Sequence, residues 1–235
     1  GFDPLVEGRL LTFEVYGLLD GVLTMIDRET ETVWTHLDGK AISGELQGAR
    51  LNIVPLPYMT WGQWKASHPN TMVLSPNTAF QDRYRSVKIG IFNPNEAPYG
   101  DDRLPANTLV VGVEVNGEFK GYPLDEVRDA GGVVNDMLGG QPIVVIYDED
   151  ARIGLAYFRT LEDQVLEFLN VSAQGLELQD EQTMSIWSSQ GAASSGSLEG
   201  HSLQFVSSFI TEWYGWSGYH PSTGLYRGPE QPDSS

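Results

Sequence analysis

Two histidines follow paired tryptophans in the same pattern. Both segments read W-x-x-W-x-x-x-H-P-x-T, one starting at Trp61 and the other at Trp213. An imidazole held by its neighbours can serve as a metal ligand or a general base, so His68 and His220 are candidates for that chemistry. The alternative is that the rings fill the core and their N–H groups cap a loop. Because duplicated folds keep their packing residues while a site is usually needed once, the recurrence favours the structural role.

Oxygen-bearing side chains gather in two further places. Asp102 lies in a proline-rich segment, and Asn135 and Asp136 follow a glycine pair. Carboxylate and amide oxygens bind Ca²⁺ or Mg²⁺ when loops bring enough of them together, so these residues, with His68, form a candidate site for a divalent metal. Their spacing fits no EF-hand, and Asp and Asn are also ordinary turn residues. The cofactor prediction therefore stays open between a divalent metal and none.

Aromatic residues near the C-terminus define a candidate ligand-binding site. The site comprises Trp213, Tyr214, Trp216, Tyr219 and His220. Exposed rings of this kind stack on a sugar ring or another flat ligand, whereas buried rings belong to the core. Their helical spacing favours burial. Tyr214 is the best candidate for an exposed ring, because the first tryptophan segment has glycine at the corresponding position.

The amino-acid composition argues against several classes of function for this chain. The 235 residues include 14 Lys and Arg, 32 Asp and Glu and no Cys, for a formal net charge of −18. Such a charge repels nucleic-acid phosphates and anionic lipid, and no apolar run of about 18 residues is present to span a membrane. Without Cys the chain has no disulfide, thiolate metal site or cysteine nucleophile. The motifs G-x-S-x-G and H-E-x-x-H and the P-loop are also missing, which disfavours the enzymes that carry them.

An internal repeat relates the candidate residues to one another. The offset of 152 residues between the two tryptophan segments also aligns glycine-rich stretches upstream of each. Offsets of 153 to 156 continue the match towards the N-terminus, where Trp34 aligns with Trp187 and Phe2 with Phe158. Rare residues that recur at nearly fixed spacing indicate a duplication.

The first copy is shorter than the second. The upstream part of the second copy, residues 109–157, has no counterpart, which predicts that the sequence is a truncated piece of a longer two-copy protein. Strands within residues 2–16 would then lack neighbours, so we expect homo-oligomerisation through the exposed edge of the first repeat. The predicted organisation is a truncated first repeat (1–75), an irregular connection (76–106), a second repeat (107–228) and a frayed tail (229–235).

Short strands and tight turns dominate the predicted secondary structure. An Asn-Gly hairpin signal follows the alternating residues 109–115, and a proline opens a short helix over 124–129. Aromatic residues at helical spacing predict helices over 58–67 and 208–219, each ending at His-Pro. We therefore expect a mainly β (α+β) fold with a few short helices: two duplicated antiparallel-sheet or open-barrel units with short covering helices.

The joined motifs resemble the DUF3179 family, a set of proteins of unknown function. The resemblance is carried by Trp-x-x-Trp-x-x-x-His-Pro at 61–69, Asp-Arg-Leu-Pro at 102–105, Tyr-Pro-Leu at 122–124, Val-Asn-Asp at 134–136 and Gly-Gly-x-Pro at 139–142. It implies that full-length members carry a Tyr-Cys-Pro-x-Cys stretch just before the equivalent of Phe2. Any metal or redox role of those cysteines lies outside this chain.

The resemblance supplies no activity, so three functions are weighed. The first, which we favour, is a ligand-binding or scaffold protein for a small molecule or carbohydrate, with a cleft between the copies bordered by residues 76–106. The second is a metal-assisted hydrolase or redox enzyme whose ligands lie partly in the missing N-terminal part. The third is a carbohydrate-binding module that uses Tyr214 and Tyr219. We lean towards a secreted or periplasmic location.

Overall fold

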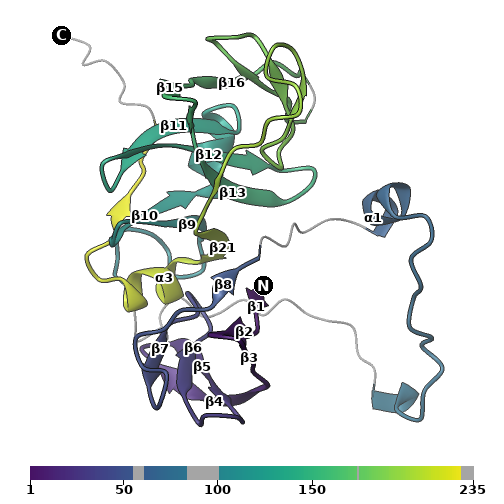
Figure 1. Cartoon of the computed structure of the whole chain (residues 1–235), viewed down its shortest axis with the longest axis vertical. Helices are drawn as coiled ribbons and strands as arrows, with labels where there is room; N and C mark the ends of the chain where they lie inside the picture. The colour runs from purple at the N-terminus through teal and green to yellow at the C-terminus, as the bar shows by residue number, and fades with distance from the viewer. Residues whose placement is uncertain (55–60, 84–100, 174, 229–235) are drawn as a thin grey trace.

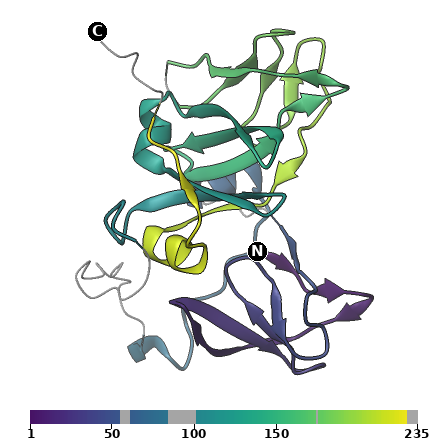
Figure 2. The same ribbon diagram turned by 90° about the vertical axis from the view of Figure 1, so that its left-hand side faces the viewer.

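Small, mostly antiparallel sheets make up the protein, which confirms the mainly β prediction. The computed structural model describes residues 1–54, 61–83, 101–173 and 175–228. Figure 1 shows a smaller unit formed by the N-terminal residues (purple) and a larger unit formed by residues from 101 onwards (teal to yellow). The turned view in Figure 2 shows the same division. Within the described ranges, no helix has the length and apolar character needed to cross a membrane.

The smaller unit consists of short strands joined by tight turns. β1 pairs with β8, β2 pairs with β3, and a four-stranded sheet has the order β4-β5-β6-β7. The strands are β1 (Phe2–Asp3), β2 (Leu5–Val6), β3 (Arg9–Leu10), β4 (Phe13–Leu19), β5 (Val22–Asp27), β6 (Val33–Thr35), β7 (Ala41–Ser43) and β8 (Asn52–Ile53). Trp34 is fully buried in its core, with Phe13 packed edge-on against the indole.

The larger unit contains three four-stranded sheets and one hairpin. The sheets have the orders β21-β9-β10-β22, β11-β12-β13-β20 and β16-β17-β18-β19, and β14 pairs with β15. The strands are β9 (Leu109–Val115), β10 (Glu118–Pro123), β11 (Val133–Leu138), β12 (Gln141–Asp148), β13 (Ile153–Phe158), β14 (Thr160–Leu161), β15 (Gln164–Val165), β16 (Phe168–Asn170), β17 (Leu178–Asp180), β18 (Ile186–Trp187), β19 (Ala193–Ser195), β20 (Phe205–Val206), β21 (Ser208–Glu212) and β22 (Gly224–Leu225). The helices are α2 (Leu124–Asp129), as predicted, and α3 (Trp213–Tyr219).

Alternation along β12 supplies side chains to two separate cores. Ile143 and Val145 enter the apolar cluster shared with β9 and α2. Val144 and Ile146 enter the cluster that contains Trp187. A strand buried on both faces has to be apolar throughout, which explains the uninterrupted Ile-Val-Val-Ile run.

The smaller unit and the C-terminal part of the larger unit share a buried hydrogen-bond pattern. The indole Nε1 of Trp34 donates to Asp27 Oδ2 at 2.8 Å, and that of Trp187 donates to Asp180 Oδ2 at 2.9 Å. In both units a threonine three residues after the aspartate also donates to the carboxylate. Burial works to raise the pKa of Asp27, but the hydrogen bonds from Trp34 and Thr30 outweigh it and lower the pKa.

Strand register corrects the predicted alignment at the N-terminus. Phe2 pairs with Ile53 in the smaller unit, and Tyr157 pairs with Phe205 in the larger one. Phe2 therefore corresponds to Tyr157, and the predicted match to Phe158 is wrong by one residue. The error arises because side-chain type alone does not fix register when two aromatic residues are adjacent.

Among the described residues, strands β9 to β12 and helix α2 have no counterpart in the smaller unit. In the larger unit, the side-chain amide of Asn135 in β11 donates to the carbonyl of Phe168 in β16 and accepts from its N–H. The corresponding strand of the smaller unit is β4, which lies at the edge of its sheet with Val15, Tyr16 and Leu18 exposed. This strand is therefore an open edge.

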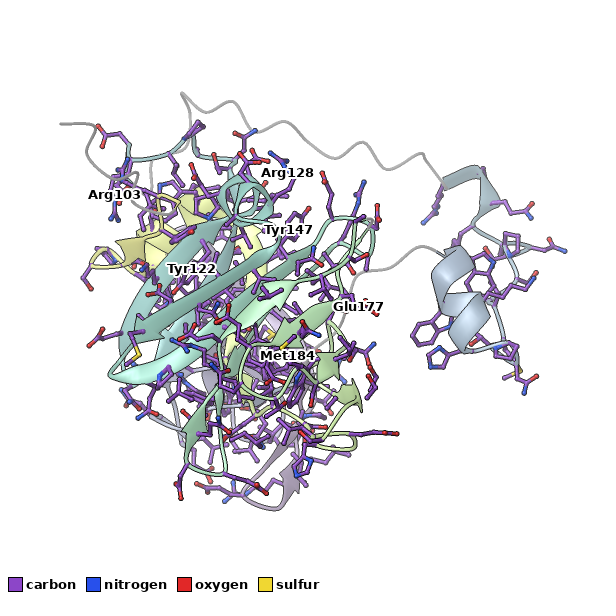
Figure 3. The ribbon with its side chains drawn as sticks, turned by 90° about the horizontal axis from the view of Figure 1, so that it is seen from above. Arg103, Tyr122, Arg128, Tyr147, Glu177 and Met184 are labelled. Carbon is purple, nitrogen blue, oxygen red and sulfur yellow. The ribbon has the colours of Figure 1, made fainter. Side chains whose placement is uncertain are left out.

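The helix predictions are partly confirmed. Residues 61–83, which contain α1 (Trp61–Ser67) and the 3₁₀ turn η1 (Gln81–Arg83), lie apart from both units in Figures 1 and 3. Residues 58–60 of the predicted first helix and residues 84–100 of the predicted connection lie outside the described residues. The helix predicted over 208–219 is wrong in its first part, because residues 208–212 pair with β9 and must be extended.

Helix α3 packs its two tryptophans on β9 and β10. The exposed fraction is 0% for Trp213 and 1% for Trp216, whereas the corresponding Trp61 and Trp64 of α1 are 52% and 38% exposed. A Cβ atom at Gly112 of β9 would lie 2.4 Å from the Trp216 ring, so any larger residue would push the helix away. The same sequence pattern is thus buried in one copy and exposed in the other.

This difference predicts unequal stability effects of matched substitutions. Trp216→Ala is expected to lower the free energy of unfolding by about 3–5 kcal/mol, because it empties a buried site. Trp64→Ala is expected to change it by less than about 0.5 kcal/mol, because the ring contacts little of the fold. Urea unfolding followed by circular dichroism measures both; equal losses would contradict the packing described.

Candidate functional site

The two units meet at an interface that is apolar on one side and polar on the other. Val22 and Leu37 of the smaller unit join Val110, Trp213 and Trp216 in one buried cluster. Figure 1 shows α3 next to β6 and β7 at this junction. We use the term inter-unit cluster for the polar side chains beside it. They are Thr35, Asp38, Arg50, Glu114, Tyr219 and His220.

Arg50 bridges the units through two carboxylates. Its guanidinium lies 3.1 Å from Asp38 Oδ2 of the same unit and 2.6 Å from Glu114 Oε2 of the larger unit. Burial disfavours the charged guanidinium, but the hydrogen bond to Glu114 and the charges of both carboxylates outweigh burial and raise the pKa of Arg50. Because Asp38 is buried, this cation also compensates a carboxylate that would otherwise be costly.

Hydroxyl groups of both units lie next to the carboxylate of Asp38. The Thr35 hydroxyl donates to Asp38 Oδ1, and the Tyr219 hydroxyl lies 3.5 Å from the same oxygen. Burial is the main cause that raises the pKa of Tyr219, so its hydroxyl keeps its proton and can donate. Tyr219, predicted as a ligand-binding residue, is thus placed in the contact between the units.

His220 is buried at the end of α3. Its ring stacks on Phe119 with centroids 3.9 Å apart and lies 4.5 Å from the Trp216 ring. Within the described part of the chain, Nε2 is a buried polar atom without a hydrogen-bond partner. Burial lowers the pKa of His220 to about 4, so the imidazole is neutral at physiological pH.

The predicted aromatic platform is largely occupied by intramolecular contacts. Trp216 Nε1 donates to Thr223 Oγ1 at 2.8 Å, and Trp213 Nε1 donates to Asp101 Oδ1 at 3.1 Å. Arg103, labelled beside α3 in Figure 3, lies 5.1 Å from the centroid of the Trp213 ring. Both indoles therefore stabilise the fold and present no free face.

Tyr214 is the aromatic residue of α3 that fits the predicted exposed position best, although it is half-buried. Burial raises the pKa of its hydroxyl, with the charge of Glu212 and a hydrogen bond to it adding to the effect. Tyr219, the other ring of the predicted sugar platform, makes the contact with Asp38 described above. Stacking of a sugar on these two rings stays a prediction.

The predicted metal residues lie in separate places. Asp136 accepts from Lys120 Nζ at 2.6 Å and from the Tyr122 hydroxyl at 2.8 Å. Burial works to raise the pKa of Asp136, but these two hydrogen bonds outweigh it and lower the pKa. The carboxylate is therefore charged and already compensated by a cation.

The other predicted metal ligands have different surroundings. Asn135 bonds to the backbone of β16, and Asp102 is exposed. His68 stacks on Trp64 with centroids 4.0 Å apart, in the segment that lies away from both units. Among the residues that the structure describes, no group of three or more His, Asp or Glu side chains is arranged to hold a metal ion. Metal binding by these residues stays a prediction.

A cavity of about 550 Å³ lies between the units. The smaller unit contributes residues 1–2, 36–37 and 53–54 to its walls, and the larger unit contributes residues 152–155 and 208–211. Most of these side chains are apolar, as in typical small-molecule sites of roughly 300–1,000 Å³. The cavity is placed between the copies as predicted, but none of the described residues from 76–106 lines it.

Two basic side chains in the cavity wall form no ion pair with any residue that the structure describes. Ion pairs with carboxylates involve Arg9, Arg28, Arg50, Arg103, Lys120, Arg128 and Arg159. Arg152, which is exposed, makes no hydrogen bond or ion pair with any described residue, and the ring of His36 makes none either. In a chain with a net charge of −18, a guanidinium left without a carboxylate is available to an external anion.

Most of this arrangement joins residues that are far apart in the sequence and carry no local motif. The predicted sites included neither Asp38, Arg50 and Glu114 nor Arg152. A usable signal is the comparison of the two copies, since Asp38 is replaced by Gln190 in the second copy. Asp38 and Arg50 are charged in the first copy only, and the bridge from Arg50 to Glu114 joins the two units.

These features define a two-unit, mainly β protein with an internal repeat, and its family can be stated. The family described as "Protein of unknown function (DUF3179)" matches residues 1–223. The chain therefore belongs to the DUF3179 family, which confirms the resemblance of its motifs. No curated protein and no solved structure matches the chain. The family has no described activity, so function has to be argued from the site.

The buried imidazole predicts a specific pH dependence of stability. The pKa of His220 is about 4 in the folded protein and near 6.5 in the unfolded chain. Between these values the unfolded chain binds a proton that the folded protein does not, so the free energy of unfolding falls as the pH decreases. The loss is at most about 1.4 kcal/mol per pH unit.

His220→Phe is expected to remove this part of the pH dependence, because phenylalanine keeps the stacking and does not titrate. Urea unfolding at pH 7, 6, 5 and 4.5 measures the slope for both proteins. The same substitution at the exposed His68 provides the reference. An unchanged slope in His220→Phe would contradict the assignment.

Proposed function

We propose that the protein is a binding protein whose ligand, a small amphipathic anion, occupies the cavity between the two units. The observation that carries the proposal is the cavity of about 550 Å³ with apolar walls from both units and Arg152, which pairs with no carboxylate among the described residues. The apolar part of the ligand would lie against residues such as Phe209 and Ile210. Its anionic group would pair with the guanidinium, which offers several donors in a planar arrangement.

The overall negative charge does not oppose this proposal at physiological salt. At about 0.15 M ionic strength the Debye length is roughly 8 Å, so distant carboxylates are screened while a direct contact is not. A charge-assisted hydrogen bond contributes about 1.5–3 kcal/mol, which corresponds to roughly tenfold or more in affinity. The pairing with Arg152 should therefore be measurable.

Decanoate and decanol test the proposal, because they share a chain and differ in charge. In calorimetric titrations of the whole protein, the ratio of the decanoate to the decanol dissociation constant is expected to rise about tenfold in Arg152→Gln, since only decanoate loses its cation. Arg83→Gln, at an arginine outside the cavity that pairs with no carboxylate of the described residues, is the matched control and should leave the ratio unchanged.

A second variant separates the cavity from nonspecific binding. Ile210→Trp fills the cavity and is expected to weaken both ligands. An unchanged ratio in Arg152→Gln, or full binding in Ile210→Trp, would place the ligands elsewhere and refute the proposal.

Self-association is a second proposal, favoured by the open edge of β4. This strand exposes Val15, Tyr16 and Leu18, and no strand in the described part of the chain takes the place that β11 has in the larger unit. Two such edges can pair and bury their apolar side chains.

Light scattering measures this association directly. The mass is expected to rise between micromolar and millimolar concentration, and Val15→Lys should reduce the rise because a buried charge opposes pairing. A strictly monomeric mass over the whole range would contradict it. Exposed Met184→Lys, on the larger unit, is the control for added positive charge.

A further inference from the structure

Helix α1 exposes the two tryptophans that its counterpart α3 buries. Trp61 and Trp64 are 52% and 38% exposed, against 0% and 1% for Trp213 and Trp216. The two helices have the same length and the same W-x-x-W-x-x-x-H-P-x-T pattern. The sequence of α1 is therefore suited to a contact that the described residues do not provide.

The local structure of α1 matches that of α3 without such a contact. Trp64 Nε1 donates to Thr71 Oγ1 at 2.8 Å, as Trp216 Nε1 donates to Thr223 Oγ1 at 2.8 Å. The backbone N–H of His68 donates to the carbonyl of Trp64 at 2.8 Å, the same bond that His220 makes. The helix is thus preorganised, so binding of a partner would not include the conformational entropy cost of folding it.

The larger unit shows what this kind of helix binds. A ribbon of two antiparallel strands, β9 and β10, presents Gly112 and Gly121 to α3, and Cβ atoms there would lie 2.4 Å from the Trp216 ring and 3.0 Å from the Trp213 ring. Phe119 of the same ribbon stacks on the histidine that follows the helix. Two glycines and one aromatic ring therefore form the surface that accepts the helix.

The start of α3 adds a further contact. The first N–H groups of a helix have no partner inside it. In α3 the N–H of Trp213 donates to the carbonyl of Thr108, immediately before β9, and that of Tyr214 donates to Ala106. These two bonds join the start of α3 to the segment that leads into β9.

The smaller unit has no such ribbon among its described residues, and a second surface is open for the same reason. The strand β4 corresponds to β16, which in the larger unit contacts β11 through Asn135. Helix α1 and strand β4 are exposed. Their counterparts in the larger unit, α3 and β16, are covered by elements within residues 109–138.

We propose that α1 docks through Trp61 and Trp64 onto a two-stranded antiparallel β-ribbon from outside residues 1–235. The ribbon would carry glycines opposite the two indoles and an aromatic ring opposite His68, in the pattern of β9 and β10. The glycines let the helix approach closely, and the aromatic ring replaces Trp64 as the stacking partner of the imidazole. This interaction is independent of the ligand proposed for the cavity.

A second folded copy of the chain does not offer this surface. One face of its β9–β10 ribbon is covered by α3. Side chains of the other face, such as Val111 and Tyr122, belong to the buried core. Association through the β4 edge would leave both faces covered, so it does not compete with this proposal.

A labelled hairpin peptide tests the docking. The probe is a cyclised peptide with the sequence of residues 109–123, titrated with the whole 235-residue protein and followed by fluorescence anisotropy. The matched control is the same peptide with Gly112→Val and Gly121→Val. We expect the control peptide to bind at least tenfold more weakly, and the Trp61→Ala/Trp64→Ala double variant of the protein to bind the original peptide at least tenfold more weakly.

Acrylamide quenching provides a second measurement in the unmodified protein. Trp34, Trp187, Trp213 and Trp216 are at most 1% exposed, so quenching reports mainly on Trp61 and Trp64. The original peptide is expected to protect this fluorescence. Unfolding midpoints of the double variant establish that it remains folded.

Four results would overturn the proposal. They are equal binding of both peptides, unchanged binding by the double variant, a tryptophan-dependent dimer of the protein alone in sedimentation velocity, and tryptophan-dependent binding to neutral phosphatidylcholine vesicles. The third would identify a second copy as the occupant, and the fourth a lipid surface. Weaker binding of the control peptide and weaker binding by the double variant, together with protection from quenching by the original peptide, would support docking of α1 onto a β-ribbon.

Discussion

The close approach of two indoles to a glycine-bearing ribbon is the constraint on which the larger unit and the unit interface depend. Because β9 and β10 carry Gly112 and Gly121, α3 lies against them at a distance that a methyl group would prevent. The helix in turn places Trp213 and Trp216 in the cluster that receives Leu37 from the smaller unit. The residues that follow on this helix bring Tyr219 to the buried carboxylate of the other unit. One packing contact thus determines both the fold of one unit and the position of the other.

The two copies have kept one interaction and changed another. The aspartate–indole hydrogen bond recurs in both because it lies inside each unit and satisfies a buried carboxylate. The charges of Asp38 and Arg50 occur in one copy, because they act between units and only one copy faces the other at this position. The interaction inside each unit is thus common to both copies, whereas the bridge between the units depends on residues of one copy.

Local patterns were enough to predict the fold class, the hairpin after residues 109–115, the helix α2 and the repeat. These features depend on neighbours in the sequence, whose chemistry can be read directly. The boundary between β21 and α3 could not be predicted. Residues 208–212 adopt an extended conformation because they pair with β9, which lies about 100 residues away in the sequence. The same limit applies to the site: the partners Arg50 and Glu114 are 64 residues apart, and the cavity has walls from five separate segments.

Both units contribute walls to the cavity. Binding of a ligand there would therefore be coupled to the relative position of the two units. A molecule held there would contact β8 on one side and β21 on the other, so it would brace two units that the described residues also join through the Arg50–Glu114 bridge, the Tyr219–Asp38 contact and one apolar cluster. By thermodynamic linkage, any interaction that stabilises the contact between the units would strengthen ligand binding by the same free energy by which the ligand stabilises that contact. A ligand in the cavity would therefore also set the angle between the units, and any surface that spans both units would change with it.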